Sequence, residues 1–182
     1  MATQFESLSE RHREFIDRQP MFFVGTAARS GRVNISPKGL DTLRVVGPNR
    51  VVWLNLTGSG NETSAHLLDQ NRMTIMFCAF ERRPVILRLY GKATEVLPSQ
   101  PGWSDLAPLF PPLVGSRQIF DLEIDLVQTS CGFGVPLMEH IEDRALLLDW
   151  ALKKGPEGLR DYHREKNLVS IDGFPTGLDV HP

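Results

Sequence analysis

The sequence predicts an α+β domain in which six or seven antiparallel strands close into a small β-barrel with flanking helices. Apolar runs of strand length follow one another along most of the chain. Most of the links between them are short enough for hairpins, which join antiparallel neighbours. Helices and strands do not alternate, as a doubly wound parallel sheet would require.

The expected strands differ in how many of their faces are buried. The run from Val51 to Leu56 is apolar throughout and predicts a strand buried on both faces. In 120–126, apolar residues alternate strictly with acidic ones, so one face of that strand is wet. Pro37 ends the second strand or places it at a sheet edge. The strands are expected at 21–26, 33–36, 42–46, 51–56, 73–80, 85–96 and 120–126, within a barrel that spans about 21–129.

The helices are expected at the ends and margins of the barrel. Apolar residues at helical spacing between Phe5 and Ile16 predict the first of them. In the last substantial helix, Leu146, Leu147 and Trp150 form one apolar face, and Gly155 ends it. The helices are expected at 6–17, 62–70, one or two turns within 98–112, 142–154 and 158–166, so that the C-terminal helices span about 140–167 and an irregular tail follows from 172 to 182.

Length and composition favour one globular domain that spans residues 1–182. The net charge of −2 provides no basic stripe, which argues against nucleic acid as a partner. No apolar run is long enough for a membrane span, and the N-terminal residues have no apolar signal-peptide core. Cys78 and Cys131 fit no disulfide or metal spacing. We therefore expect a cytoplasmic protein without structural disulfides.

The stretch from Val51 to Leu68 combines a strand, a glycine-containing loop and a helix. A helix N-terminus after such a loop presents backbone N–H donors that suit a phosphate. In the alternative interpretation, Gly58 and Gly60 simply allow a turn with positive φ. Two capping arrangements are possible for the helix: Ser59 and Glu62 as a capping box, or Asn61 or Thr63 as the cap itself.

Familiar protein-only catalytic motifs are absent from the sequence. It contains no H-E-x-x-H, no G-x-S-x-G and no Walker loop. The five histidines are scattered, so no metal site is expected. Cys131 lies in a glycine-flanked loop, but no basic residue adjoins it to activate the thiol. These observations indicate that a bound cofactor carries the chemistry, or that there is none.

Three runs carry a family resemblance: VNISPKGLDTLRVV, VVWLNLTGSGNETSAHLLDQNRMTIMFCAFE and VILRLYGKATEVLP. Together they resemble the pyridoxamine 5′-phosphate oxidase-like flavoproteins, which are FMN-binding split-barrel proteins. The combination of SPKG, TGSG-x-E-T and LYGKA at this spacing is specific to the family. The likeness covers about 20–171 and is greatest to an uncharacterised branch that also carries CGFGVPLM and KGPEGL.

The resemblance implies a homodimer of split barrels, with two FMN molecules in clefts shared between the subunits. In that family the flavin lies along the strand that matches 33–36, a lysine that matches Lys38 reaches the phosphate region, and the strand end 55–57 touches the cofactor. The loop that leads into the helix holds the phosphate. The residues implied as cofactor-binding are Arg32, Asn34, Ser36, Lys38, Asn55, Thr57, Gly58, Asn61, Thr63 and Arg88.

The chain departs from the authentic oxidases at two places. Their phosphate loop carries an arginine–lysine pair, whereas this chain has Glu62 and its neighbours there. The positive charge must then come from Lys38, Arg32 or Arg88, although Lys38 could also be a solvated turn lysine and Arg88 a surface cation. The C-terminal arginine and histidine that hold pyridoxal phosphate are also absent. The resemblance thus supports flavin binding more strongly than vitamin B6 oxidation.

The leading hypothesis is an FMN-dependent oxidoreductase that acts on a small molecule of unknown identity, with its catalytic residues unknown. The alternatives are a non-catalytic flavin-binding protein, a protein that binds deazaflavin F420 or haem in the same cleft, and a cofactor-free dimeric scaffold.

Overall fold

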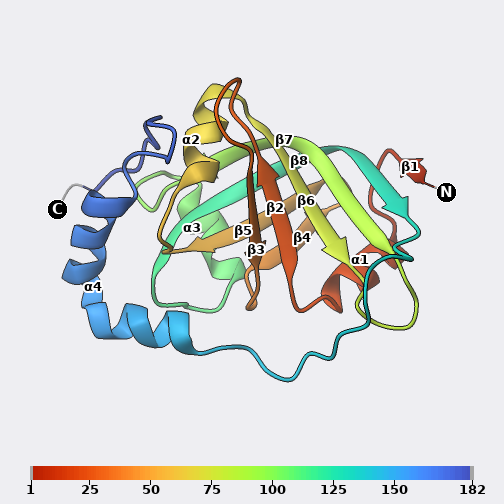
Figure 1. Ribbon diagram of the computed structural model, residues 1–182. Helices are drawn as coiled ribbons and strands as arrows, with labels where there is room; N and C mark the ends of the chain where they lie inside the picture. The colour runs from red at the N-terminus through yellow and green to blue at the C-terminus, as the bar shows by residue number, and fades with distance from the viewer. Residues whose placement is uncertain (1, 181–182) are drawn as a thin grey trace.

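The computed structural model describes residues 2–180, and all eight of the strands that it shows belong to one antiparallel sheet (Figure 1). The order along the sheet is β3-β2-β6-β7-β8-β5-β4, and β1 pairs separately with β8. The strands are β1 Thr3–Phe5, β2 Phe22–Thr26, β3 Asn34–Lys38, β4 Leu43–Gly47, β5 Arg50–Leu56, β6 Arg72–Cys78, β7 Ile86–Val96 and β8 Ser116–Ser130.

The strand β3, at one end of this order, reaches β5, next to the other end, as expected in a barrel. Lys38 at the end of β3 lies over the ring of Trp53 in β5, with Nζ 4.9 Å from the ring centroid. The enclosed core contains large side chains from the inward faces of several strands, among them Trp53, Phe77 and Phe120, each at most 2% exposed. The predicted α+β class with an antiparallel, coiled sheet is confirmed.

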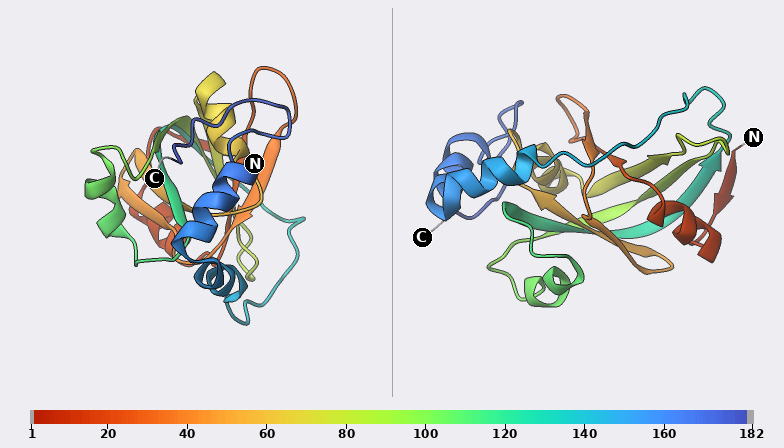
Figure 2. Two further views of the ribbon diagram at one scale, coloured as in Figure 1. Left: turned by 90° about the vertical axis from the view of Figure 1, so that its left-hand side faces the viewer. Right: turned by 90° about the horizontal axis from the view of Figure 1, so that it is seen from below.

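The helices surround the sheet: α1 Glu10–Asp17, α2 Glu62–Asp69, α3 Trp103–Leu106 with the 3₁₀ turn η1 Ala107–Leu109, and α4 Leu146–Lys166. Figure 2 shows that α3 lies on the opposite side of the sheet from the extended segment 131–145. Leu106 and Phe110 pack there against Ile119 in a second apolar cluster. Among the described residues, no helix is both long and apolar enough to cross a membrane.

The N-terminal prediction was partly wrong. Residues 3–5 form a strand, β1, and the first helix starts only at Glu10 because Ser9 caps it. The Ser9 side chain accepts from the His12 N–H, and His12 Nδ1 accepts from the Ser9 N–H. The spacing of apolar residues alone does not reveal this reciprocal cap. The sheet has one strand more than the seven expected at most, because residues 3–5 pair with 127–129 of β8.

The C-terminal helical prediction also needs correction. Residues 139–144 are not helical, and α4 runs from Leu146 through a sharp bend at Gly155, where φ is 67°. The face with Leu146 and Leu147 was expected to be apolar and to pack as such, yet these two side chains are 70% and 38% exposed. The segment after α4 is irregular up to residue 180, as expected, and residues 181–182 lie outside the described part.

Candidate functional site

A hollow of about 710 Å³ lies where β3, the end of β5, the start of α2 and segment 166–171 converge. Figure 1 shows the end of β5 and the N-terminus of α2 between β3 and α4. Its lining comes from two distant parts of the chain: Arg32, Val33, Asn34, Ser36, Lys38, Asn55, Gly58, Ser59, Gly60, Asn61, Glu62, Thr63 and Arg117 from the barrel, and Lys166, Val169, Ser170 and Ile171 from the C-terminal segment.

Most of the residues expected from the sequence line this hollow. Those that do are Arg32, Asn34, Ser36, Lys38, Asn55, Gly58, Asn61 and Thr63. Thr57 lies behind the wall, where its hydroxyl donates to the Gly115 carbonyl at 2.9 Å and contacts His163 Nε2 at 2.9 Å. Arg88 lies elsewhere on β7, and its guanidinium donates to Ser130 Oγ at 3.1 Å. Its position therefore does not support a role in this hollow within the same chain.

Asn61 is the N-cap of α2, which is one of the expected arrangements, but its side chain makes no cap bond. Its Oδ1 instead accepts from Ser64 Oγ at 2.9 Å and from Gln118 Nε2 at 2.6 Å. The Glu62 carboxylate, expected to complete a capping box, accepts from the Ile171 N–H at 3.0 Å. The N–H groups in the first turn of α2 therefore remain without intrahelical partners, as in any α-helix.

Asn61 also holds an unused donor. The side chain is only 2% exposed, and its Nδ2 has no hydrogen-bond partner among the described residues. The two bonds to Oδ1 fix the amide orientation, so Nδ2 is the group left over. A buried donor without a partner costs about 1–3 kcal/mol, and a ligand acceptor in the hollow would recover this.

The loop glycines do not serve a left-handed turn. Neither Gly58 nor Gly60 is among the glycines with positive φ, so that interpretation of the loop was wrong. A Cβ atom on Gly58 would meet nothing within 4 Å, and one on Gly60 would lie 3.4 Å from Glu62 Oε1. These glycines therefore leave open space in the hollow and let a ligand approach the backbone.

Four cations line the hollow against one carboxylate, Glu62. Two of them have carboxylate partners outside the lining: Arg32 pairs with Asp172, and Lys166 with Glu165. Lys38 forms no ion pair among the described residues. Burial, followed by repulsion from Arg117, lowers the pKa of Lys38 to about 8. The balance of charge favours an anionic ligand.

Arg117 is the functional candidate that the sequence reasoning missed. It is 4% exposed and donates to the Gln118 and Asn167 side chains at 2.6 and 2.7 Å, and to the Gly60 carbonyl at 3.2 Å. Burial lowers its pKa to about 10, so it remains a cation at neutral pH. The nearby charge of Glu95 opposes this decrease in pKa and offsets part of the cost of burying the cation. Arg117 thus holds a fixed positive charge beside the loop, and only its unusual place in a buried strand could have signalled it.

Asn167 ties the C-terminal segment to the loop. It is fully buried, and its Nδ2 donates to the Gly58 carbonyl at 3.0 Å. Its own carbonyl accepts from Thr176 Oγ1 at 2.6 Å. The segment 166–171, just before the irregular tail, thus forms one wall of the hollow. Among the described residues, no three His, Cys, Asp or Glu side chains gather in a way that could hold a metal ion.

Residues 8–131, more than half of the chain, match the family model described as pyridoxamine 5′-phosphate oxidase. The chain belongs to the pyridoxamine 5′-phosphate oxidase family. The matched region includes β3, β5, α2 and Arg117, but it ends before α4. The resemblance expected from the sequence motifs is confirmed.

Within this family, a curated relative is the pyridoxamine 5′-phosphate oxidase family protein ustO of Aspergillus flavus. It is 35% identical over 191 residues, which cover 94% of this chain and 76% of the relative. A solved structure of a putative pyridoxamine 5′-phosphate oxidase from Lactobacillus delbrueckii has a TM-score of 0.55 at 16% identity, with 68% of this chain and 94% of that chain covered. The match confirms the split-barrel fold.

A second solved structure of the same fold is described as a FAD-binding protein from Mesorhizobium loti. Its TM-score is 0.50 at 11% identity, and the match covers 71% of this chain and 96% of that chain.

Proposed function

We propose that this chain binds FMN in the hollow and acts as an oxidoreductase on a small molecule. The observation that best supports this proposal is the unpartnered Nδ2 of Asn61, a residue that lines a basic hollow at the N-terminus of α2. A phosphate supplies the acceptor oxygens and negative charge that such a set of donors and cations lacks. The family match and the FAD-binding description of the Mesorhizobium loti protein support a flavin.

The residues present fit the two parts of FMN. Asn61, Thr63 and the first-turn N–H groups of α2 would hold the phosphate, with Lys38 and the buried Arg117 supplying positive charge. Asn34 and Ser36 on β3 and Asn55 at the end of β5 offer polar groups for the ring system. Glu62 is kept in place by the Ile171 N–H.

Bound flavin would supply the hydride chemistry, because it accepts and returns two electrons. The protein's share is to orient the substrate over the ring, to exclude water and to set the local charge. Segment 166–171 covers one side of the hollow, so it restricts access from that direction. The residues of this chain do not specify the substrate.

The proposal includes a homodimer with the cofactor at the interface. Val33, which lines the hollow, and Ile35, in the edge strand β3, are each 68% exposed. Neighbouring apolar side chains exposed in this way often mark an interaction surface. Sedimentation of the purified protein should show a dimer, and the charged variant Ile35→Glu should sediment as a monomer with less bound flavin. A wild-type monomer would contradict this part.

The deciding experiment is a visible absorption spectrum of the purified protein, with mass identification of whatever denaturation releases. We expect a flavin spectrum and FMN in the supernatant. A colourless protein that takes up no added FMN would contradict the proposal, and released F420 or haem would replace FMN as the cofactor. Flavin that no nicotinamide or organic donor reduces faster than free FMN would limit the function to binding.

A further inference from the structure

Residues 131–145, here named the arm, form neither helix nor strand and expose four large apolar side chains. These are Phe133, Leu137, Met138 and Ile141, which are 82%, 70%, 61% and 88% exposed. The arm begins with the CGFGVPLM motif, to which the proposed function gives no role. Apolar side chains gathered on one exposed segment are typical of an interaction surface.

The path of the arm is fixed by contacts at its start and in its middle. Gly132 has a φ of 64°, and a Cβ atom there would lie 3.2 Å from the Val85 backbone. The Met138 N–H donates to the Phe80 carbonyl at 3.0 Å. From there the arm crosses below the barrel to α4 (Figure 1). The backbone is thus held in place while the apolar side chains stay exposed.

A second hollow, of about 700 Å³, lies on the outer face of the sheet over β2, β3, β6 and β7. Val24 and Ile75 in these strands face the core, so the alternation of side chains turns Phe23 and Met76 outward. Phe23 and Met76 lie directly opposite each other in the pairing of β2 with β6. Ile35, 68% exposed, borders them from β3. This sheet face is therefore apolar where solvent would favour polar residues.

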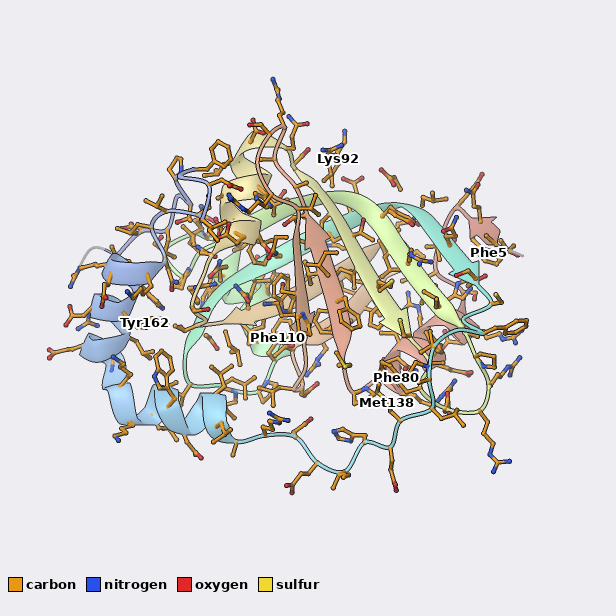
Figure 3. All side chains as sticks on the ribbon, in the orientation of Figure 1. Phe5, Phe80, Lys92, Phe110, Met138 and Tyr162 are labelled. Carbon is orange, nitrogen blue, oxygen red and sulfur yellow. The ribbon has the colours of Figure 1, made fainter. Side chains whose placement is uncertain are left out.

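The arm does not reach the second hollow of its own chain. Among the described residues, none from the arm lines it. Figure 3 shows Met138 next to Phe80 below the barrel, whereas Lys92, which lines the hollow, lies at the upper edge. A contact between the two surfaces therefore requires two copies of the chain.

The arm and the second hollow carry opposite net charges. The charged residues of the arm are Glu139, Glu142, Asp143 and Arg144. Those that line the hollow are Arg72, Lys92 and Asp125. Three carboxylates against one guanidinium give the arm a net charge of −2, and two cations against one carboxylate give the hollow +1. Within the described part of the chain, Glu139 and Glu142 form no ion pair, and neither do Arg72 and Lys92.

We propose that the second hollow receives the arm of a second copy of this chain, so that the two copies exchange arms. Glu139 and Glu142 of each arm meet Arg72 and Lys92 of the other copy, and the apolar side chains pack on the outer face of its sheet. The interface is isologous, so every contact is made twice. The exchange presupposes the homodimer of the proposed function and specifies the segment that holds it together.

The exchange also brings the arm to the cofactor site of the other copy. Val33 lines both the first and the second hollow. An arm seated in the second hollow therefore borders the first one, and each copy completes the surroundings of its partner's site.

Sedimentation of the full-length protein over a dilution series tests the arm. Glu139→Lys/Glu142→Lys should raise the Kd of the dimer about 10- to 100-fold, because like charges then face each other. Asp17→Lys/Asp105→Lys is the matched control, since it reverses two exposed carboxylates that belong to neither surface, and it should sediment as the wild type does. Ile141→Ser, at an exposed position that the barrel does not need, should also weaken the dimer.

A charge swap tests the second hollow as the receiving surface. Arg72→Glu/Lys92→Glu alone should be as weakly dimeric as Glu139→Lys/Glu142→Lys. An equimolar mixture of the two should dimerise with the wild-type Kd, because both arms of the mixed dimer then meet opposite charges. This recovery requires both variants to be folded, which circular dichroism of each checks separately.

Three results would overturn the arm exchange: a monomeric wild type, an arm variant with the wild-type Kd, and two folded variants whose mixture stays monomeric. The second and third leave the proposed homodimer in place and remove only the arm from its interface. A colourless wild-type dimer whose arm variants dissociate would contradict FMN binding and support the exchange.

Discussion

Gly58 gives a direct test of the first hollow at the level of one residue. Because it faces open space and has no positive φ, the fold itself does not need glycine there. Gly58→Val should leave the unfolding midpoint unchanged and weaken FMN by about 10-fold or more, since the side chain occupies ligand space. Thermal unfolding and fluorescence titration with FMN provide the two measurements.

Gly134→Val is the matched control, since Gly134 also faces open space but lies outside the hollow. It should change neither quantity. A loss of stability without loss of affinity in Gly58→Val would show that the glycine only shapes the turn.

Lys38 predicts how FMN affinity depends on pH. Its pKa of about 8 in the free protein means that it is mostly charged at pH 7 and loses its charge as the pH rises above 8. The Kd for FMN should therefore increase between pH 7 and 9. Lys38→Met should bind FMN about 10- to 100-fold more weakly at pH 7 and lack this pH step, because a charge-assisted bond is lost.

Titrations of both proteins across this range, followed by flavin fluorescence, check the prediction. If Lys38→Met has the wild-type Kd for FMN at pH 7, the aliphatic part of Lys38 is buried but the residue has no role in binding.

Whether a residue of the hollow could be predicted depended on how far away in the sequence its contacts lie. Lys38, Asn55 and Asn61 were implied by the family resemblance of one short stretch of strands, loop and helix, and all three line the hollow. Arg117 and Asn167 could not be predicted, because the groups that give them meaning, such as the Gly58 and Gly60 carbonyls, lie more than fifty positions away. Their role depends on which strands become neighbours.

Among the elements, α4 is attached to the barrel through a neutral histidine. Burial, with a contribution from Arg117, lowers the pKa of His163 to about 4, and its Nε2 meets Thr57 Oγ1 at 2.9 Å. Because the folded pKa lies below the ordinary 6.5, this contact stabilises the fold fully above pH 6.5 and is lost as the pH falls towards 4.

Hydrogen exchange in 156–166 should accordingly accelerate between pH 6.5 and 4 beyond its intrinsic pH dependence. His163→Gln should lack this component, because an amide can still donate to Thr57 and does not titrate in this range. His140→Gln, at an exposed position, should behave like the wild type. An unchanged pH profile in His163→Gln would show that another group controls the attachment of α4.

The elements themselves were predictable where periodicity was strong, as in β8 with its alternation of apolar and acidic residues. Predictions failed where a few hydrogen bonds decide the boundary, as with Ser9 at the start of α1. They also failed for residues 142–145, which were expected to be helical but precede the start of α4 at Leu146.

For the whole molecule, the coiling of the sheet depends on the close approach of β7 and β8 at Gly91. A Cβ atom there would lie 1.9 Å from the Glu123 carbonyl oxygen, next to the register shift between Tyr90 and Gly91. This close approach explains why the LYGKA motif has a glycine at this position. Gly91→Ala should lower the free energy of unfolding by about 3 kcal/mol or more, or prevent folding.

Gly25→Ala in β2 is the comparison, because the nearest atom to its added Cβ would be 3.9 Å away. Urea unfolding of the two variants should show near wild-type stability for this one only. Equal stability of both would mean that β7 and β8 can separate at the bulge without cost.

The two-part lining of the first hollow also has a consequence for synthesis. Its barrel wall is complete once residue 117 has folded, but Lys166 to Ile171 are made about fifty residues later. A chain emerging from the ribosome must therefore build the whole sheet before the cavity can retain a cofactor. On the proposed function, flavin shortage should then leave a folded, empty barrel rather than an unfolded chain, and cofactor loading would be the last event in maturation.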